Sequence, residues 1–316
     1  MIFKITIKHA GERLDKFLAN NLSNLSRNQI QKLIKEGGIT VNDKPATPHH
    51  ALKDNDIIYI LKQKSEISEQ AKPAPNQMLP RIDVIADTKE YLVINKPAGL
   101  ITHGAPHIQE ITLADVLLKQ YPLLEKIGEN RARPGIVHRL DKEASGLLAI
   151  AKSQGSFENL KKQFQKRTVD KKYIALVYGP IIKEEGIINF PLKRAANGHK
   201  IAAIPATIKG KLSSEGREAV TEFKVIKKFI NYTLLEIKIK TGRTHQIRAH
   251  LAAYGHPIVG DNLYGTPKIR LKNKKINLGR IFLAANELSF TDLSGERKNF
   301  KIDLPQDLKN FLNTIK

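Results

Sequence analysis

The sequence of 316 residues contains no cysteine. Disulfide bonds, thiolate nucleophiles, iron–sulfur clusters and the cysteine-rich zinc sites of nucleobase deaminases are therefore excluded. No apolar run approaches the ~18 residues of a membrane-spanning helix, and the N-terminus lacks the continuous apolar stretch of a signal peptide. We therefore expect a cytoplasmic protein that does not associate with a membrane.

Acidic residues are scarce relative to basic ones. The chain has 53 Lys and Arg against 31 Asp and Glu, a formal net charge of +22. An excess of this size favours nucleic acid or another polyanion as the partner. The length leaves room for one large domain and one small one.

Common signatures of nucleotide and metal sites are also missing. Residues 206–213 contain a Gly-Lys pair but lack the first glycine of a phosphate-binding loop, and no Gly-x-Gly-x-x-Gly follows a strand pattern. Gly104 and Pro106 prevent the helix that would aim His103 and His107 at one metal ion. We therefore expect neither a nucleotide cofactor nor a metal ion.

The N-terminal pattern, from Gly11 to about residue 61, predicts two helices followed by short strands. Ser26 and Gln29 fit a capping box at the start of the second helix, and Gly37 and Gly38 fit its end. Basic residues on helices often serve only solubility. The pattern nevertheless resembles the alpha-L RNA-binding domain first described in a small-subunit ribosomal protein, which implies RNA contacts. The candidate residues are Arg13, Lys16, Arg27, Lys32 and Lys35.

Residues 62–80 are polar, contain proline and lack periodicity, which predicts a linker. Beyond it, strand-like runs alternate with a few helices, one capped by Ser153 and another from about Thr244 to Tyr254. This order without strict βαβ repetition indicates an α+β fold. We predict a small domain over residues 11–70, a linker to about residue 80, and a large domain over residues 81–316.

Two charged clusters stand out in the large domain, at residues 135–142 and 241–250. In the first, Asp141 follows an apolar run and lies among His138, Arg139 and Lys142. Neighbouring positive charge favours the ionised form of an acid, so Asp141 is the first catalytic candidate. The alternative is a strand end with solvated charges. The second cluster again places Arg and His around a glycine turn, and together they indicate one site that faces a polyanion.

Five segments in the order of the chain resemble the RluA family of pseudouridine synthases, especially the branch with an N-terminal alpha-L domain. These segments are residues 93–99, residues 133–142 with 145–147, residues 172–175, residues 241–250, and residues 255–261 with 264–265. The resemblance implies isomerisation of uridine in RNA without a cofactor. It also implies the pseudouridine synthase fold, with a mixed, mainly antiparallel sheet and flanking helices.

The resemblance assigns roles to three catalytic candidates. Asp141 is implied as the essential carboxylate, acting at the ribose either as nucleophile or as base. Arg243 is implied as its partner, although an arginine there could instead contact phosphate. Tyr173 is implied to stack on the flipped base, although its alternating strand also fits a core residue.

The remaining candidates contact RNA or the base. By the resemblance, Arg139 enters the space that the flipped uridine leaves, because a guanidinium plane stacks on bases. Leu283 is the candidate for an apolar wall of the uracil pocket. The other expected RNA contacts in the large domain are His138, Lys142 and Arg248.

The resemblance also indicates the partner, which is large-subunit ribosomal RNA or its assembly intermediates, and we expect the protein to act as a monomer. The target uridine stays open: residues 133–142 favour enzymes of the helix 69 stem-loop, whereas residues 103–105 favour those of other large-subunit sites. The alternative function is a non-catalytic RNA-binding or ribosome-assembly protein with the same fold.

Overall fold

The computed structural model describes residues 2–22, 27–60, 79–104, 110–130, 132–195, 200–205 and 216–316. Several sequence-based predictions concern other parts of the chain. These are the capping box of Ser26 and Gln29, the side chain of Lys32, most of the linker, His107, and the Gly-Lys segment at 206–213, and all of them lie outside the described residues.

The chain divides into two compact units between residues 74 and 75. The elements of the small unit are β1 (Ile2–Lys4), α1 (Leu14–Asn21), α2 (Arg27–Lys35), β2 (Ile39–Val41), β3 (Lys44–Pro45) and β4 (Ile57–Ile60). Its strands form an antiparallel sheet in the order β1-β4-β2-β3. The sequence pattern placed the start of this unit at Gly11. In the structure the unit also includes residues before Gly11, because β1 pairs with β4 and Ile5 is buried.

Apolar side chains at helical spacing hold the small unit together. Leu14, Phe17 and Leu18 of α1 pack with Ile30 and Ile34 of α2 in one buried cluster. The helix α2 ends before Gly37, whose φ of +77° suits glycine because it has no Cβ. The predicted two helices followed by short strands are therefore present.

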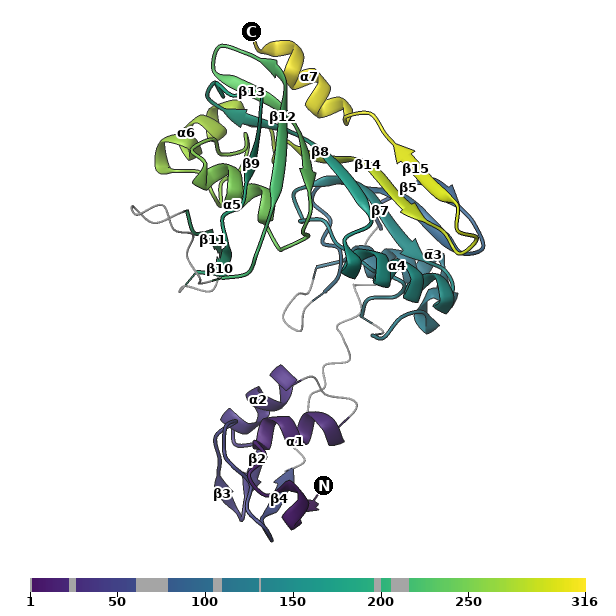
Figure 1. The fold of residues 1–316 in the computed structure, drawn as a ribbon, viewed down its shortest axis with the longest axis vertical. Helices are drawn as coiled ribbons and strands as arrows, with labels where there is room; N and C mark the ends of the chain where they lie inside the picture. The colour runs from purple at the N-terminus through teal and green to yellow at the C-terminus, as the bar shows by residue number, and fades with distance from the viewer. Residues whose placement is uncertain are drawn as a thin grey trace. The chain divides into compact units, whose positions relative to one another are not determined.

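The large unit combines helices with one extended sheet and a separate two-stranded sheet, in which residues 192–194 pair with residues 201–203 (Figure 1). Its helices are α3 (Leu113–Gln120), α4 (Gln154–Lys166), α5 (Gln246–Ala253), α6 (Pro267–Ile276) and α7 (Gln306–Thr314). Its strands are β5 (Asp83–Asp87), β6 (Tyr91–Lys96), β7 (Ser145–Ala151), β8 (Asp170–Tyr178), β9 (Glu185–Ile188), β10 (Leu192–Arg194), β11 (Ile201–Ala203), β12 (Thr221–Lys228), β13 (Tyr232–Ile239), β14 (Leu283–Thr291) and β15 (Arg297–Lys301).

The main sheet has the strand order β5-β6-β7-β14-β8-β13-β12-β9, and β15 also pairs with β14. The pair β7–β14 is parallel, and the other described pairs are antiparallel. The expected α+β fold with a mixed, mainly antiparallel sheet is therefore confirmed. None of the described helices is long and apolar enough to cross a membrane.

Helices cover both faces of the sheet at β7, and all seven residues of this strand are buried. Leu147 and Ala149 face Phe157 and Leu160 of α4, and Leu148 faces the cluster that includes α3. As predicted, α4 is capped by Ser153, whose hydroxyl accepts a hydrogen bond from the N–H of Ser156 at 3.2 Å. The sheet is therefore packed on both faces at β7, the strand that follows the Asp141 loop.

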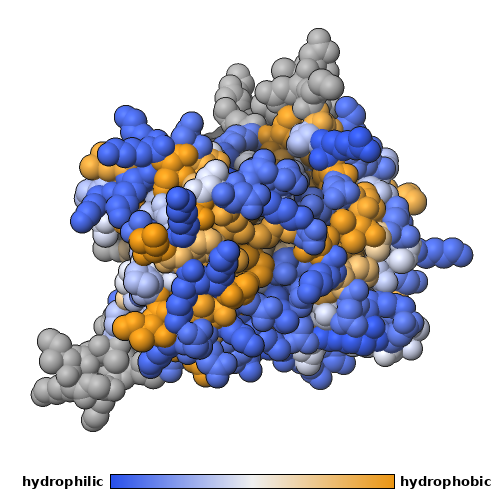
Figure 2. All heavy atoms as spheres, turned by 90° about the horizontal axis from the view of Figure 1, so that it is seen from above, coloured by the Kyte–Doolittle hydropathy of each residue, from blue (hydrophilic) through white to orange (hydrophobic). Residues whose placement is uncertain are grey.

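Four segments of the large unit come together around one cavity. Asp141 lies ahead of β7, Leu283 begins β14, Tyr173 lies in β8, and residues 241–245 follow β13. Within the sheet, Ala284 is opposite Ser145, and Tyr173 is opposite Ile237. Segments more than 100 residues apart in sequence therefore meet at one place. Figure 2 shows one face of the molecule, on which hydrophilic side chains predominate and hydrophobic ones lie between them.

Candidate active site

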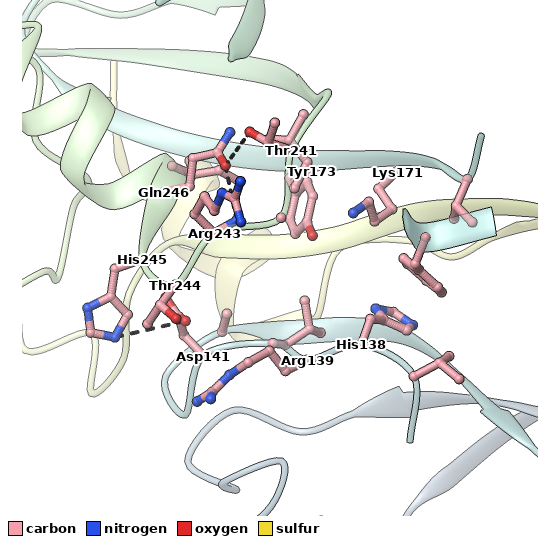
Figure 3. A pocket seen from close by; sticks show the side chains of 18 of the residues that line it. His138, Arg139, Asp141, Lys171, Tyr173, Thr241, Arg243, Thr244, His245 and Gln246 are labelled. Atoms are coloured by element: carbon pink, nitrogen blue, oxygen red, sulfur yellow. Dashed lines mark hydrogen bonds and ion pairs between the residues drawn. The ribbon is translucent and has the colours of Figure 1, made fainter. Parts of the chain in front are cut away.

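A cavity of about 460 Å³ lies where these four segments meet. Figure 3 shows its two sides, with Asp141, Arg139 and His138 on one and Tyr173 and Arg243 on the other. Seven of the predicted residues line it: Asp141, Tyr173, Arg243, Arg139, His138, Arg248 and Leu283. The structure thus brings both charged clusters of the sequence into one site.

The carboxylate of Asp141 is held by Arg248. Their side chains form an ion pair at 3.3 Å, and the Arg248 side chain is only 3% exposed. Arg248 also pairs with Glu143 at 3.2 Å. With its Nε and Nη2 it donates to both oxygens of Asp261, at 2.7 and 3.0 Å. The Arg248 guanidinium therefore lies between three carboxylates and contacts each of them.

The surroundings of Arg248 fix its charge and direction. Burial alone would lower the pKa of the guanidinium, but the hydrogen bonds to Asp261 and the charges of Asp261, Asp141 and Glu143 raise it above its usual value. Asp261 is fully buried and also accepts hydrogen bonds from the N–H groups of Leu263 and Tyr264, each at 3.0 Å. Asp261 thus orients Arg248, and Arg248 orients Asp141.

The predicted pair between Arg243 and Asp141 differs from what the structure has. Among the contacts of the described residues, none joins these two side chains, and Arg243 Nε donates to the carbonyl of Glu218 at 3.5 Å. Arg243 is exposed in the turn before α5, whereas Arg248 lies on the buried side of that helix. Arg248 was predicted only as an RNA contact. Arg248 precedes the apolar Leu251 by three residues, a spacing that places both on one face of a helix. This spacing was the signal in the sequence, because an arginine on a buried face needs a carboxylate partner.

A buried glutamine fixes the turn that carries Arg243. The amide oxygen of Gln246 accepts hydrogen bonds from Thr241 Oγ1 at 2.7 Å and from the N–H of Arg243 at 3.1 Å. Its amide nitrogen donates to the carbonyl of Val220 at 3.0 Å. The next residue back, His245, has a left-handed φ of +53°. These contacts start α5 at Gln246 and thereby set which residues face inward.

His245 is a second neighbour of Asp141 that sequence reasoning left without a role. Its Nε2 lies 3.9 Å from Asp141 Oδ1, and its Nδ1 lies 3.1 Å from the hydroxyl of Tyr264. That hydroxyl also accepts a hydrogen bond from the N–H of Ile201 at 3.0 Å. Burial lowers the pKa of His245, although the charge of Asp141 opposes this shift. The imidazole is therefore neutral near pH 7.

Tyr173 is a buried phenol on the wall opposite Asp141, with 6% of its surface exposed. Burial and the negative charge of Asp141 raise its pKa well above the usual value. The side chain is therefore neutral near pH 7 and presents its ring to the cavity. Leu283, 3% exposed, adds an apolar side chain to the lining.

A buried lysine that the sequence did not single out ties the Asp141 loop to β6. The ammonium of Lys96 donates to the carbonyls of Pro97 at 2.7 Å, Leu100 at 2.8 Å and Lys142 at 3.3 Å. Burial, assisted by the charge of Arg280, lowers the pKa of Lys96 to about 7, against the opposing charge of Asp141. Lys96 thus fixes the backbone next to Asp141.

Two residues predicted to contact RNA have partners within the protein, and their contact with RNA stays a prediction. His138 Nε2 accepts a hydrogen bond from the N–H of Ala149 at 3.0 Å, and its ring stacks on Phe164 with centroids 4.4 Å apart. Burial, with the charge of Lys171, lowers the His138 pKa well below its usual range. Lys142 forms an ion pair with Glu110 at 2.5 Å. Arg139, by contrast, is exposed at the cavity.

In the small unit, a carboxylate organises two of the candidate basic residues. Asp15 is fully buried and accepts two hydrogen bonds each from Arg13 and Arg27, at 2.9–3.2 Å. Burial would raise the pKa of Asp15, but the hydrogen bonds from Arg13, Gln31 and Arg27 lower it below its usual range. Nearly half of each arginine side chain stays exposed. Lys16 and Lys35 are exposed as well.

Comparison with known proteins identifies both units. The model of the RNA pseudouridylate synthase family matches residues 90–253, and that of the S4 domain matches residues 12–58. The chain belongs to the RNA pseudouridylate synthase family. It is therefore an isomerase that acts on RNA, and the predicted resemblance to the RluA family is confirmed.

Relatives of this pseudouridine synthase match nearly all of its length. An RNA pseudouridine synthase of Aquifex aeolicus is 36% identical and covers 98% of this chain and 95% of its own. The ribosomal large subunit pseudouridine synthase D of Neisseria meningitidis serogroup A is 35% identical, with 99% and 81% covered. Human RNA pseudouridylate synthase domain containing 4 has a similar structure, with a TM-score of 0.59, 26% identity, and 73% and 92% covered.

Replacing Arg248 should lower the stability of the large unit far more than replacing Arg243. Arg248→Gln leaves the buried Asp261 without its cation, and we expect a loss of about 3–5 kcal/mol in the free energy of unfolding. The exposed Arg243→Gln is the matched control and should change it by no more than about 0.5 kcal/mol. Urea denaturation measures both. Equal effects of the two substitutions would contradict the assignment of Arg248 as the central cation.

Proposed function

We propose that this enzyme converts specific uridines of large-subunit ribosomal RNA to pseudouridine and that Asp141 acts on the ribose. The RNA class follows from relatives such as the Neisseria enzyme, whose name states large-subunit specificity and which matches 99% of this chain. The observation that carries the assignment of Asp141 is its carboxylate, 14% exposed and bound to Arg248 in a cavity with Tyr173.

The geometry suits either route to glycosidic bond exchange. As a nucleophile, Asp141 would bond to C1′ of the ribose as the bond to N1 of uracil breaks. As a base, it would remove the proton from C2′. Both routes need an ionised carboxylate with a fixed direction, which the ion pair with Arg248 at 3.3 Å supplies.

The uridine has to leave its stack to reach Asp141, at a cost of a few kcal/mol. The exposed Arg139 lies two residues before Asp141 in sequence and lines the cavity. Its guanidinium would take the vacated place between bases. Inside the cavity, the Tyr173 ring and Leu283 would contact the uracil. A non-catalytic RNA-binding protein would not need these groups around one carboxylate.

The small unit would add affinity for structured RNA. We infer that Arg13, Lys16, Arg27 and Lys35 contact phosphates, with Asp15 holding the two arginines in place. Each neutralised phosphate releases counterions, so binding through these residues weakens as salt rises. Lys32 remains a candidate by its position in α2.

Asp141→Asn should abolish isomerisation but leave RNA binding intact, because the variant loses one carboxylate and keeps the basic surface. Tritium release from large-subunit ribosomal RNA labelled at C5 of uridine measures turnover, and filter binding measures affinity. Asp170→Asn, an exposed residue of β8, is the matched control and should release tritium like the wild type. Turnover by Asp141→Asn above background would refute the role of Asp141.

Removing two lysines from the small unit should weaken the salt dependence of RNA binding. For Lys16→Gln with Lys35→Gln, we expect the slope of log K against log salt to shrink by about 1 for each phosphate that the protein no longer neutralises. Lys228→Gln with Lys298→Gln removes the same charge from lysines of the large unit that pair with Glu184 and Glu296. If both double variants change the slope equally, the small unit has no specific role in binding.

A further inference from the structure

Lys171 stands in the cavity without a carboxylate beside it. It lies in β8, two residues before Tyr173, and both side chains line the cavity, as the alternation of a strand requires. Its ammonium lies 5.2 Å from the centre of the Phe164 ring. Among the described residues, no ion pair or hydrogen bond of this ammonium is present. Figure 3 shows Lys171 next to Tyr173, on the wall opposite Asp141.

The described neighbours of Lys171 supply no negative charge, because His138 and Tyr173 are neutral and Arg243 is a cation. His138 accepts a hydrogen bond from the N–H of Ala149 and has a lowered pKa, in part because of the charge of Lys171 itself. Tyr173 is a neutral phenol. The turn of Gly242 and Arg243 closes the third side, and a Cβ on Gly242 would lie 3.4 Å from the ammonium. Among the described residues, no carboxylate forms an ion pair that would offset the cost of burying this charge.

The neighbouring lysine shows the usual arrangement. Lys172 points to the other face of the strand and pairs with Glu236 at 3.3 Å and Glu287 at 3.1 Å. These contacts raise its pKa, whereas burial lowers the pKa of Lys171 to about 8. Two adjacent lysines therefore differ in one respect: the partner of Lys172 is in the protein, and that of Lys171 is missing from the described residues.

The depth of Lys171 indicates which part of the RNA supplies the missing charge. Four arginines that line the cavity are exposed and suited to phosphates: Arg133, Arg139, Arg167 and Arg243. Lys171 is half-buried and adjacent to the Tyr173 ring. It therefore faces the place of the base rather than the backbone.

We infer that the Lys171 ammonium stabilises the negative charge that uracil acquires when it leaves the ribose, an inference that rests on the proposed isomerisation. As the bond from N1 to C1′ breaks, its electron pair stays with uracil and spreads to O2 and O4, while Asp141 bonds to C1′ or takes the C2′ proton. When C5 then bonds to C1′, the bond from Asp141 to C1′ breaks or, on the base route, Asp141 returns the proton to C2′. The C5 proton is then lost and N1 gains one, so uracil is neutral again. Lys171 stays protonated throughout.

Single-turnover tritium release with excess enzyme tests this role. Removing one such donor from a water-poor site costs about 100-fold in rate or more. We expect that loss for Lys171→Met, with unchanged affinity for the RNA in filter binding. Lys171→Arg should retain most of the rate, and Lys172→Met, which removes the same charge from the other face, should stay near the wild type.

The pH profile gives a second readout, which a purely structural role would not change. The wild-type rate should fall as pH rises through the pKa of Lys171, near 8 in the free protein, whereas Lys171→Arg should keep its rate. This comparison also holds if Lys171→Met fails to fold. A folded Lys171→Met with the wild-type rate, a loss confined to RNA affinity, or identical pH profiles would overturn the inference. Absence of turnover by the wild type would instead overturn the proposed function.

Discussion

The buried guanidinium of Arg248 is the interaction on which the site depends. It joins Asp141 and Glu143 of the loop before β7 to Asp261, which follows α5 in the chain. Removing one partner from a buried charge pair costs much more than the pair contributes. The large unit is therefore stable only when these segments meet, and a folded unit has the Asp141 carboxylate already directed into the cavity.

The sheet makes this meeting possible. The parallel pair β7–β14 sets the loop of Asp141 beside Leu283, and β8 and β13 bring Tyr173 and the turn before α5 to the same cavity. Gly146 is essential to the close approach of β7 and β14, because a Cβ there would lie 2.2 Å from the carbonyl oxygen of Ala285. Lys96 then anchors the loop to β6 through three carbonyls. The contacts of Gly146 and Lys96 thus set the position of the Asp141 loop, whereas the ion pair with Arg248 sets the charge beside the Asp141 carboxylate.

Local patterns predicted the α+β fold class and the capped helix α4, because motifs and periodicity are properties of short segments, and the family resemblance supplied most of the candidate residues that line the cavity. They did not predict which arginine pairs with Asp141. Arg243 and Arg248 belong to one motif, and the inward one is decided by where α5 begins, at Gln246 rather than near Thr244. His138, Lys142 and Lys171 likewise look alike in sequence. They differ in their partners, which are the backbone N–H of Ala149, the carboxylate of Glu110 and the ring of Phe164.

If Asp141 acts on the ribose as we propose, Arg248 is the residue that aims its carboxylate. The most direct test is the single-turnover rate of Arg248→Lys, measured where circular dichroism shows that the variant is folded. Lysine keeps the charge, but one ammonium cannot bridge Asp261 and Asp141 as a guanidinium does. We expect a rate about 100-fold below that of the wild type, because the carboxylate is misplaced, with unchanged affinity for RNA. A folded Arg248→Lys variant that isomerises uridine at the wild-type rate would contradict the claim.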